Sequence, residues 1–298
     1  MKKVFAFSIG LLMAVSSFGQ SIKVTPAFKK GMVKTYAVTS NVTVAGQTIN
    51  MTSEQKYTIT KEVPEGYEMT LETTDFKSDG NQDNPLSRLL TISDEILKNS
   101  RIQILLNKEG KVMDIVNYQE VKEKSLTMAN HIIDELFEST PEISQVLKKE
   151  TLREQVSKEL TSEKIINGLT VSASPLALFG RTITSGMEDK YNNNMVSLKR
   201  IWLVTGKVVG ASAKADMSRE ELKTFILSQV EKMAPQQADM IKENIDQVLN
   251  TGLIKLDMSE KSNYELADDL WVKSMTNDME SNFMGQKSDT HTKIQLKN

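Results

Sequence analysis

The segment from residue 101 to residue 137 constrains the fold of this chain most. Within it, the spacing of apolar residues changes from every second residue, typical of a strand, to about every 3.6 residues, typical of a helix. Ile102, Ile104 and Leu106 alternate along one arm of a predicted β-hairpin. Gly110 closes the turn of this hairpin, since glycine adopts positive φ without strain. Beyond the hairpin, the apolar residues fall on one helical stripe. The hairpin is predicted over Arg101–Asn117, the helix over Tyr118–Phe137, and the stripe at Val121, Met128, Ala129, Ile132 and Leu136.

Strands are predicted at both ends of the chain. In the N-terminal strands, apolar residues alternate with Ser and Thr, which is typical of an antiparallel sheet with one packed and one solvated face. Strands of this length usually curve. The N-terminal strands are expected over Met32–Ala45, Thr48–Val63 and Gly66–Phe76, and the C-terminal strands over Leu253–Leu266, Leu270–Phe283 and Lys287–Leu296.

The middle of the chain is predicted to be mainly helical. Ser218 and Glu221 have the spacing of a capping box, which marks a helix start. The sequence therefore predicts an α+β fold, in which a long curved antiparallel sheet built from the N- and C-terminal strands packs on central helices. The other expected segments are a short helix at Leu86–Leu97, helices over Gln119–Ile166 interrupted at Pro141, an irregular stretch at Asn167–Gly186 with an apolar patch at Leu176–Phe179, an extended stretch at Met195–Val209, and a helix ending near Leu249.

The first nineteen residues have the three parts of a secretory signal peptide. Lys2 and Lys3 form a basic start, Val4–Val15 is apolar, and small residues lie before Gln20. An apolar run of about 12 residues is too short to cross a bilayer core of roughly 30 Å, so a membrane anchor is the weaker interpretation. We expect residues 1–19 to be removed and residues 20–298 to form a single α+β domain.

Composition excludes several partner classes. The formal net charge is −2 and no basic cluster is present, so neither nucleic acid nor an anionic membrane is expected as a main partner. No apolar run after the signal peptide approaches membrane length, so no integral membrane segment is expected after cleavage. The chain has no cysteine, which excludes acylation at a lipobox and disulfide bonds.

Candidate catalytic and metal-binding residues are few. His131 and His291 are the two histidines, and neither has a second ligand residue at metal-binding spacing, so both are interpreted as surface residues. The segment beginning at Asp75 resembles a calcium loop, but Lys77 and Leu86 occupy positions where calcium needs oxygen ligands. Nucleophile motifs and phosphate-binding glycine loops are missing. We therefore expect neither an enzyme nor a cofactor, and no metal site.

Methionine is the unusual component of this sequence, with 16 methionines against 9 phenylalanines. Methionine is flexible and polarisable, so it either fills gaps in a core or lines a site for an adaptable apolar ligand. On the second interpretation, Tyr57, Met69 and Met275 are the predicted ligand-binding residues, because they alternate onto the apolar face of the predicted sheet.

The layout of the chain resembles a known group of proteins. The signal peptide ending in Phe18-Gly19-Gln20, the strand-rich start, the hairpin at Asn107–Val112 with its helix, and the closing hairpin at Trp271 are similar to a family of secreted Gram-negative proteins with a domain of unknown function. The general shape also resembles the half-barrel of lipoprotein carriers, which holds acyl chains. The resemblance implies an envelope location and a curved sheet, but no reaction.

The leading functional expectation is a non-catalytic, exported envelope protein that binds an apolar or lipid-like ligand. The alternative is a structural or protein-interaction module of the cell envelope without a small-molecule ligand. An apolar small molecule or an envelope protein is the expected partner, and the expected location is periplasmic or extracellular.

Overall fold

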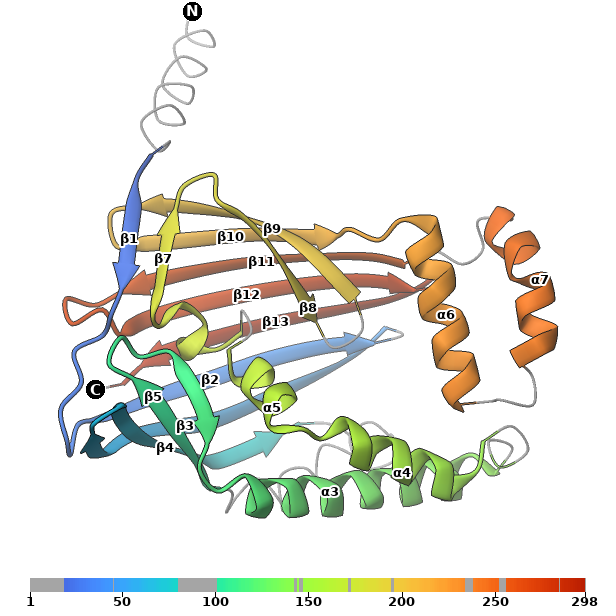
Figure 1. Cartoon of the computed structure of the whole chain (residues 1–298), viewed down its shortest axis with the longest axis horizontal. Coiled ribbons are helices and arrows are strands. Elements are labelled where there is room, and N and C mark those ends of the chain that lie inside the picture. Colours follow the sequence, from blue (N-terminus) through green and yellow to red (C-terminus); the bar gives the residue numbers. More distant parts are fainter. Residues whose placement is uncertain are drawn as a thin grey trace, which may run out of the picture.

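A large antiparallel sheet dominates the computed structural model of the chain (Figure 1). The structure describes residues 19–297 except 45, 80–100, 142–143, 145–146, 171–172, 194–195, 234–237, 252–255 and 284. The predicted signal peptide and the predicted helix at Leu86–Leu97 therefore lie outside the described residues, apart from Gly19. The sheet has 11 strands in the order β6-β5-β4-β3-β2-β13-β12-β11-β10-β9-β8, and a separate ribbon pairs β1 with β7. The strands are β1 (Ser21–Val24), β2 (Val33–Val44), β3 (Gln47–Val63), β4 (Gly66–Ser78), β5 (Arg101–Asn107), β6 (Val112–Ile115), β7 (Arg181–Thr184), β8 (Glu188–Asn193), β9 (Val196–Thr205), β10 (Val208–Ala215), β11 (Leu256–Leu266), β12 (Val272–Phe283) and β13 (Gln286–Leu296).

The predicted α+β class is wrong, because the fold is dominated by its sheet. About 50% of the structure is strand and 31% is helix. The difference arises in the middle of the chain, where part of the stretch expected to be irregular forms β7. The stretch expected to be a single extended segment instead forms a hairpin of β9 and β10, which turns at Gly206. The middle of the chain therefore contains more strand than the sequence pattern indicated.

The helices also do not form a layer packed on the apolar face of the sheet, as the sequence analysis expected. Among the described helices, the first turn of α3 and the α5 helix pack against the main core, through Tyr118, Val121, Ile165, Ile166 and Leu169. Helix α3 otherwise lies against α4, and α6 lies against α7 at the far ends of β10 to β13 (Figure 1). The helices are α3 (Tyr118–Ser139), α4 (Lys149–Glu159), α5 (Ser162–Leu169), α6 (Arg219–Met233) and α7 (Ala238–Asn250).

Two local predictions are confirmed. The hairpin of β5 and β6 leads directly into α3, and the side chain of Asn107 accepts backbone hydrogen bonds from Glu109 (3.0 Å) and Lys111 (2.9 Å) across the turn. At the start of α6, the Glu221 carboxylate accepts from the Ser218 amide (2.7 Å), and the Ser218 hydroxyl accepts from the Glu221 amide (3.2 Å). This reciprocal pair is a capping box, and it satisfies two amides that a helix start otherwise leaves unpaired.

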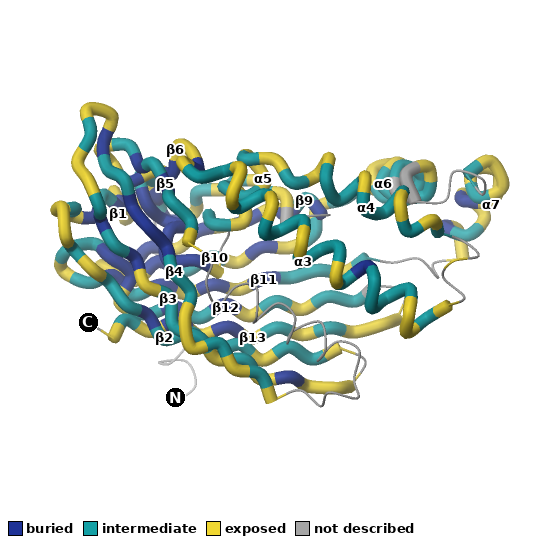
Figure 2. The backbone as a smooth tube through the Cα atoms, turned by 90° about the horizontal axis from the view of Figure 1, so that it is seen from below, coloured by how far each residue is buried: buried dark blue, intermediate teal, exposed yellow. Residues whose placement is uncertain are grey.

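The sheet curves, and its core lies at one end of the concave face. A short 3₁₀ turn, η2 (Pro175–Leu178), and the following Phe179 fill that end. Phe179 and Phe28 both lie edge-on to Trp271, with ring centroids 5.1 Å and 5.7 Å away. Figure 2 shows the buried segments gathered at this end, whereas the same strands become only partly buried toward the helices. The main core therefore lies at one end of the concave face, and a second, smaller apolar cluster of Val196, Leu198 and Ala213 lies beyond it on β9 and β10.

Candidate functional site

The three predicted ligand-binding residues lie in the filled end of the sheet. Tyr57, Met69 and Met275 are 2%, 0% and 1% exposed and belong to one core. The hydroxyl of Tyr57 donates to the Gln55 side-chain oxygen (2.8 Å), and burial raises the pKa of Tyr57. These residues pack against neighbouring side chains in the empty protein. The prediction that a ligand contacts them stays a prediction.

A large cavity lies away from this core, between the helices and the edge strand β8. Its volume is about 1200 Å³. Helices α4 and α5 form one wall, and Asn192 of β8 and Phe225 of α6 complete it. The apolar residues of the lining are Leu152, Val156, Leu160, Ile165 and Phe225.

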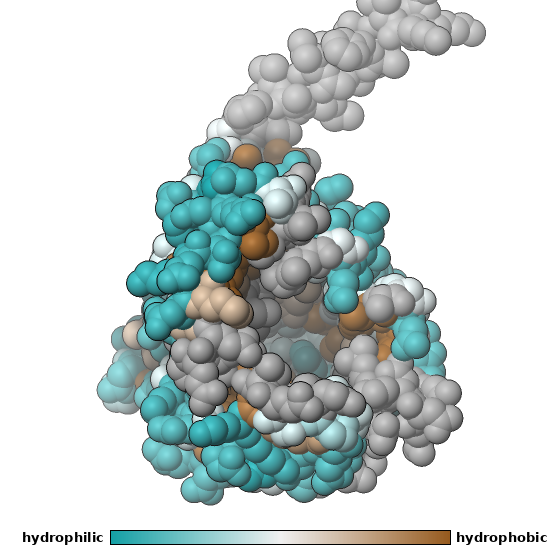
Figure 3. Space-filling model, turned by 90° about the vertical axis from the view of Figure 1, so that its right-hand side faces the viewer, coloured by the Kyte–Doolittle hydropathy of each residue, from teal (hydrophilic) through white to brown (hydrophobic). Residues whose placement is uncertain are grey.

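The apolar side chains around this cavity are not close-packed. Leu152, Val156 and Phe225 each keep an intermediate exposure, although they lie on the inner sides of their helices. Figure 3 looks onto the helix end of the molecule and shows it hollowed there, with hydrophobic and hydrophilic surface inside the hollow. We call the cavity of α4, α5 and α6 the chamber. The chamber was not predictable from the sequence, because the helical stripes were expected to pack on the sheet.

A polar network lies on the concave face between the main core and the second apolar cluster of Val196, Leu198 and Ala213. Asp189 of β8 accepts two hydrogen bonds from the Arg200 guanidinium (2.9 and 2.8 Å) and one from Arg181 (2.5 Å). Burial alone would raise the pKa of Asp189, but the hydrogen bonds and charges of Arg200 and Arg181 outweigh it and hold the pKa at about 2. The Arg200 guanidinium also lies over the rings of Tyr191 (4.4 Å) and Trp202 (4.2 Å). Both charges are thus engaged within the protein.

Glu260 of β11 is the second buried carboxylate of this network. One of its oxygens accepts from the amide of Asn277 (2.6 Å) and the hydroxyl of Ser262 (3.1 Å), and the other accepts from the hydroxyl of Tyr191. Glu260 is 5% exposed, so these bonds replace the water that the carboxylate loses on folding. This site was not predictable from the sequence, because its residues come from strands that only the sheet register brings together.

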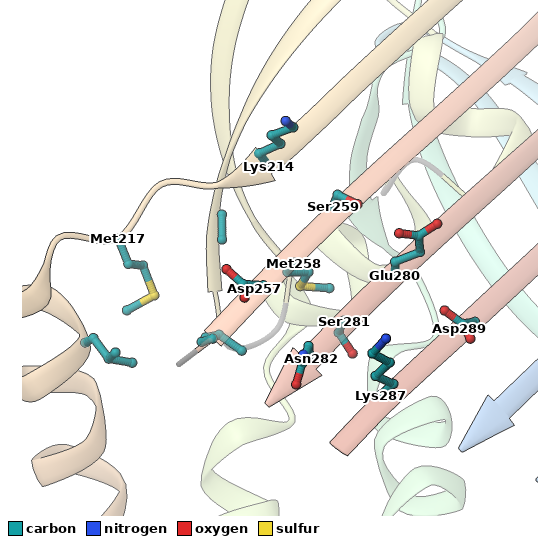
Figure 4. A pocket seen from close by; sticks show the side chains of 13 residues that line it. Lys214, Met217, Asp257, Met258, Ser259, Glu280, Ser281, Asn282, Lys287 and Asp289 are labelled. Atoms are coloured by element: carbon teal, nitrogen blue, oxygen red, sulfur yellow. The ribbon is translucent and has the colours of Figure 1, made fainter. Parts of the chain in front are cut away.

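A second cavity is polar and lies at the ends of strands β10 to β13, beside the segment leading into α6 (Figure 4). Its volume is about 770 Å³. Lys214, Ser259, Glu280 and Asp289 are consecutive cross-strand neighbours in its wall. Side chains of both charge signs line this cavity, together with apolar ones at Met217, Leu222, Leu256 and Met258.

The remaining sequence candidates carry no assembled site. His131 is exposed, and the imidazole of His291 lies against the carboxylate of Asp278 on the outer face. Within the described residues, no group of three or more histidine, cysteine or carboxylate residues is arranged to hold a metal ion. None of the helices in the described part of the chain is long and apolar enough to cross a membrane.

Comparison with known proteins finds weak structural similarity. No family model matches the chain, and no curated protein matches it. A solved structure titled "Lipid-protein interactions in lipovitellin" shares 10% sequence identity and a TM-score of 0.43, over 91% of this chain and 26% of that chain. Similarity at this level indicates neither a shared family nor a shared function. The resemblance to secreted envelope proteins therefore stays a prediction.

Proposed function

We propose that this chain is a non-catalytic envelope protein that binds an apolar, lipid-like ligand in the chamber. The observation that carries the proposal is the cavity of about 1200 Å³, whose walls combine partly exposed apolar side chains with charged ones at Glu159, Glu163 and Lys164. Ligand sites are typically concave, mostly apolar and roughly 300–1,000 Å³ in volume, so the chamber has room for an acyl chain.

The physical driving force is the removal of apolar surface from water. Each buried methylene contributes about 0.8 kcal/mol, and an acyl chain would bury both its own surface and that of Leu152, Val156 and Phe225. The filled core at the other end of the sheet would hold the fold together while the chamber is empty. Ligand exchange would therefore not require the core to open.

Titration with N-phenyl-1-naphthylamine, a neutral probe that fluoresces in apolar surroundings, tests this proposal. Wild-type protein should bind the probe saturably. Val156→Asp and Phe225→Asp place a charge in the chamber wall and should each weaken binding at least tenfold. Val33→Asp is the matched control, because Val33 is 37% exposed on the outer face of β2. No saturable binding by the wild type, or an equal loss in the control, would contradict the proposal.

A second candidate is a protein-interaction module, and a different observation favours it. Ile201, Leu203 and Val208 are exposed on the outer face of β9 and β10. A groove of about 500 Å³ lies beside Ile201 and Leu203, and the small residues Gly210 and Ser212 also line it. Absence of probe binding, together with a change in sedimentation coefficient caused by Leu203→Asp alone, would favour this candidate over ligand binding.

Export is part of the proposal. The signal-peptide pattern of Lys2, Lys3 and the apolar run Val4–Val15 supports it. Intact mass of protein from the cell envelope should therefore place the mature N-terminus at or next to Gln20. A mass that retains residues 1–19 would contradict export.

A further inference from the structure

One part of the chamber wall is apolar and partly sheltered from water. Leu152 and Val156 both line the chamber and lie one turn apart on α4, so they project from the same side of the helix. Phe225 of α6 lines the same cavity, and all three side chains keep an intermediate exposure. Gln155 also lines this stretch of α4 and interacts with another residue. We call Leu152, Val156 and Phe225 the apolar end.

The junction of α4 and α5 forms a second part of the wall with a different character. Two apolar residues of this junction, Leu160 and Ile165, keep an intermediate exposure, and Ile165 also packs against the main core. The polar members of the lining at this junction are all exposed, and we call them the polar mouth: Glu159, Thr161, Glu163, Lys164 and Asn167. The seven residues from Leu152 to Glu159 span about 10 Å of helix, so the apolar end and the polar mouth are separate along α4.

Helix α4 is held in place by contacts outside the chamber. The Asp134 carboxylate of α3 forms ion pairs with the Lys149 ammonium (2.5 Å) and with the Arg153 guanidinium. Where α4 ends, the Tyr118 hydroxyl donates to the Leu160 carbonyl (2.8 Å). These contacts within the chain fix α4 along α3 (Figure 1). A wall that is already ordered lowers the conformational entropy lost when a ligand binds.

The polar mouth is also ordered by contacts of its own. The Thr161 hydroxyl accepts from the Lys164 amide (3.3 Å) and caps α5. An ion pair between Glu159 and Lys164 joins α4 to α5. Both partners of this pair are exposed, so they stay hydrated. A polar ligand group placed in the mouth would therefore keep much of its own water.

We propose that the chamber holds a single-chain amphiphile, with its hydrocarbon chain against the apolar end and its head group in the polar mouth. This inference rests on the proposed function and adds the class and the orientation of the ligand. The chain would remove apolar surface of Leu152, Val156 and Phe225 from water. A hydrocarbon without a head group, lying along the whole lining, would instead take water from Glu159 and Lys164, which opposes binding.

The same charge placed at the two parts of the wall tests the orientation. The ligand is decyl maltoside, a neutral single-chain amphiphile, titrated by calorimetry below its micelle-forming concentration. Val156→Asp should weaken its binding at least tenfold, because a carboxylate at the apolar end loses water to the chain. Thr161→Asp is the matched variant, since aspartate caps a helix as threonine does, and it should weaken binding less than about twofold.

The outcomes of this titration separate the inference from the proposed function. Equal weakening by Val156→Asp and Thr161→Asp overturns the orientation but leaves ligand binding standing. Wild type that binds N-phenyl-1-naphthylamine but not decyl maltoside overturns the amphiphile class alone. Wild type that binds neither compound overturns both the inference and the proposed function.

Nitroxide quenching gives an independent measurement of the orientation. Phe225→Trp reports from the apolar end and Asn167→Trp from the polar mouth, and wild type gives the background of Trp202 and Trp271, which are buried in the main core. Stearate with a nitroxide near its methyl end should quench Phe225→Trp at least twofold more than stearate with a nitroxide near its carboxylate. The order should be reversed for Asn167→Trp. The same order at both positions overturns the assigned orientation.

Discussion

Tyr191 donates its phenolic hydroxyl to the carboxylate of Glu260, although β9 and β10 lie between their strands in the sheet. Strands spaced about 4.8 Å apart would place β8 and β11 roughly 14 Å apart in a flat sheet. The bond therefore requires the edge of the sheet to curl over its own concave face. The network of Tyr191, Arg200 and Asp189 therefore lies beneath the curled edge, between the main core and the second cluster of Val196, Leu198 and Ala213.

Removing this bond should loosen the curled edge. Tyr191→Phe leaves the ring over Arg200 but removes one donor from Glu260, which is 5% exposed. We expect the free energy of unfolding to fall by about 1–3 kcal/mol, since a buried carboxylate loses a partner. Urea denaturation followed by tryptophan fluorescence measures this change. A loss below about 0.5 kcal/mol would mean that the bond does not hold the edge.

Asp189 should make stability depend on pH in acid. Its pKa is lowered from 3.8 to about 2 in the folded protein, so it contributes stability that is complete above pH 3.8 and is lost as pH falls toward 2. Asp189→Asn removes this contribution and leaves Arg200 buried without its carboxylate. The stability difference between wild type and Asp189→Asn should therefore be largest above pH 4 and shrink toward pH 2. A difference that is constant with pH would contradict this assignment.

Met69 tests how solid the filled end is. Its side chain is 0% exposed, and its strand neighbours Ile59 and Ile104 are equally buried. Met69→Ala should cost roughly 2–5 kcal/mol, because it removes transfer free energy and leaves a cavity. Met113→Ala is the control, since Met113 is 52% exposed and should change stability by less than about 0.5 kcal/mol. Equal small effects in both variants would instead show that Met69 faces an open space.

Gly66 tests the pairing of β4 with β5. It has a φ of +155°, and a Cβ atom there would overlap the backbone carbonyl of Leu106 on the neighbouring strand. Gly66→Ala should therefore destabilise the protein by more than about 3 kcal/mol. Gly206→Ala is the control, because Gly206 has a φ of +59° but open space around it, and it should cost about 1 kcal/mol. Thermal unfolding of both variants compares them, and similar melting temperatures would refute the steric argument.

Features set by neighbouring residues were predictable from the sequence. The hairpin before α3 follows from the alternation of Ile102, Ile104 and Leu106, and the start of α6 follows from the spacing of Ser218 and Glu221. Both depend on contacts within a few residues of the chain, which local patterns encode directly.

Features set by long-range pairing were not predictable. Strand β8, with the sequence Glu-Asp-Lys-Tyr-Asn-Asn, has no apolar alternation, and it is held by the polar contacts of Asp189 and Tyr191 with other strands. The chamber likewise depends on where α4, α5 and α6 stop relative to the sheet. A periodic apolar stripe shows that a helix has an inner side, but not how closely that side is packed.

The pairing of β2 with β13 joins residues near opposite ends of the chain in the middle of the sheet, with Tyr36 opposite Leu296. A ribosome must therefore synthesise almost the whole polypeptide before the central pair of strands can form. Loop closure over such a separation is slow, so the nascent chain should remain unfolded for a long interval. A chain that folds this late stays unfolded long enough to pass through a narrow translocation channel. Holdase chaperones also have time to bind it before it folds.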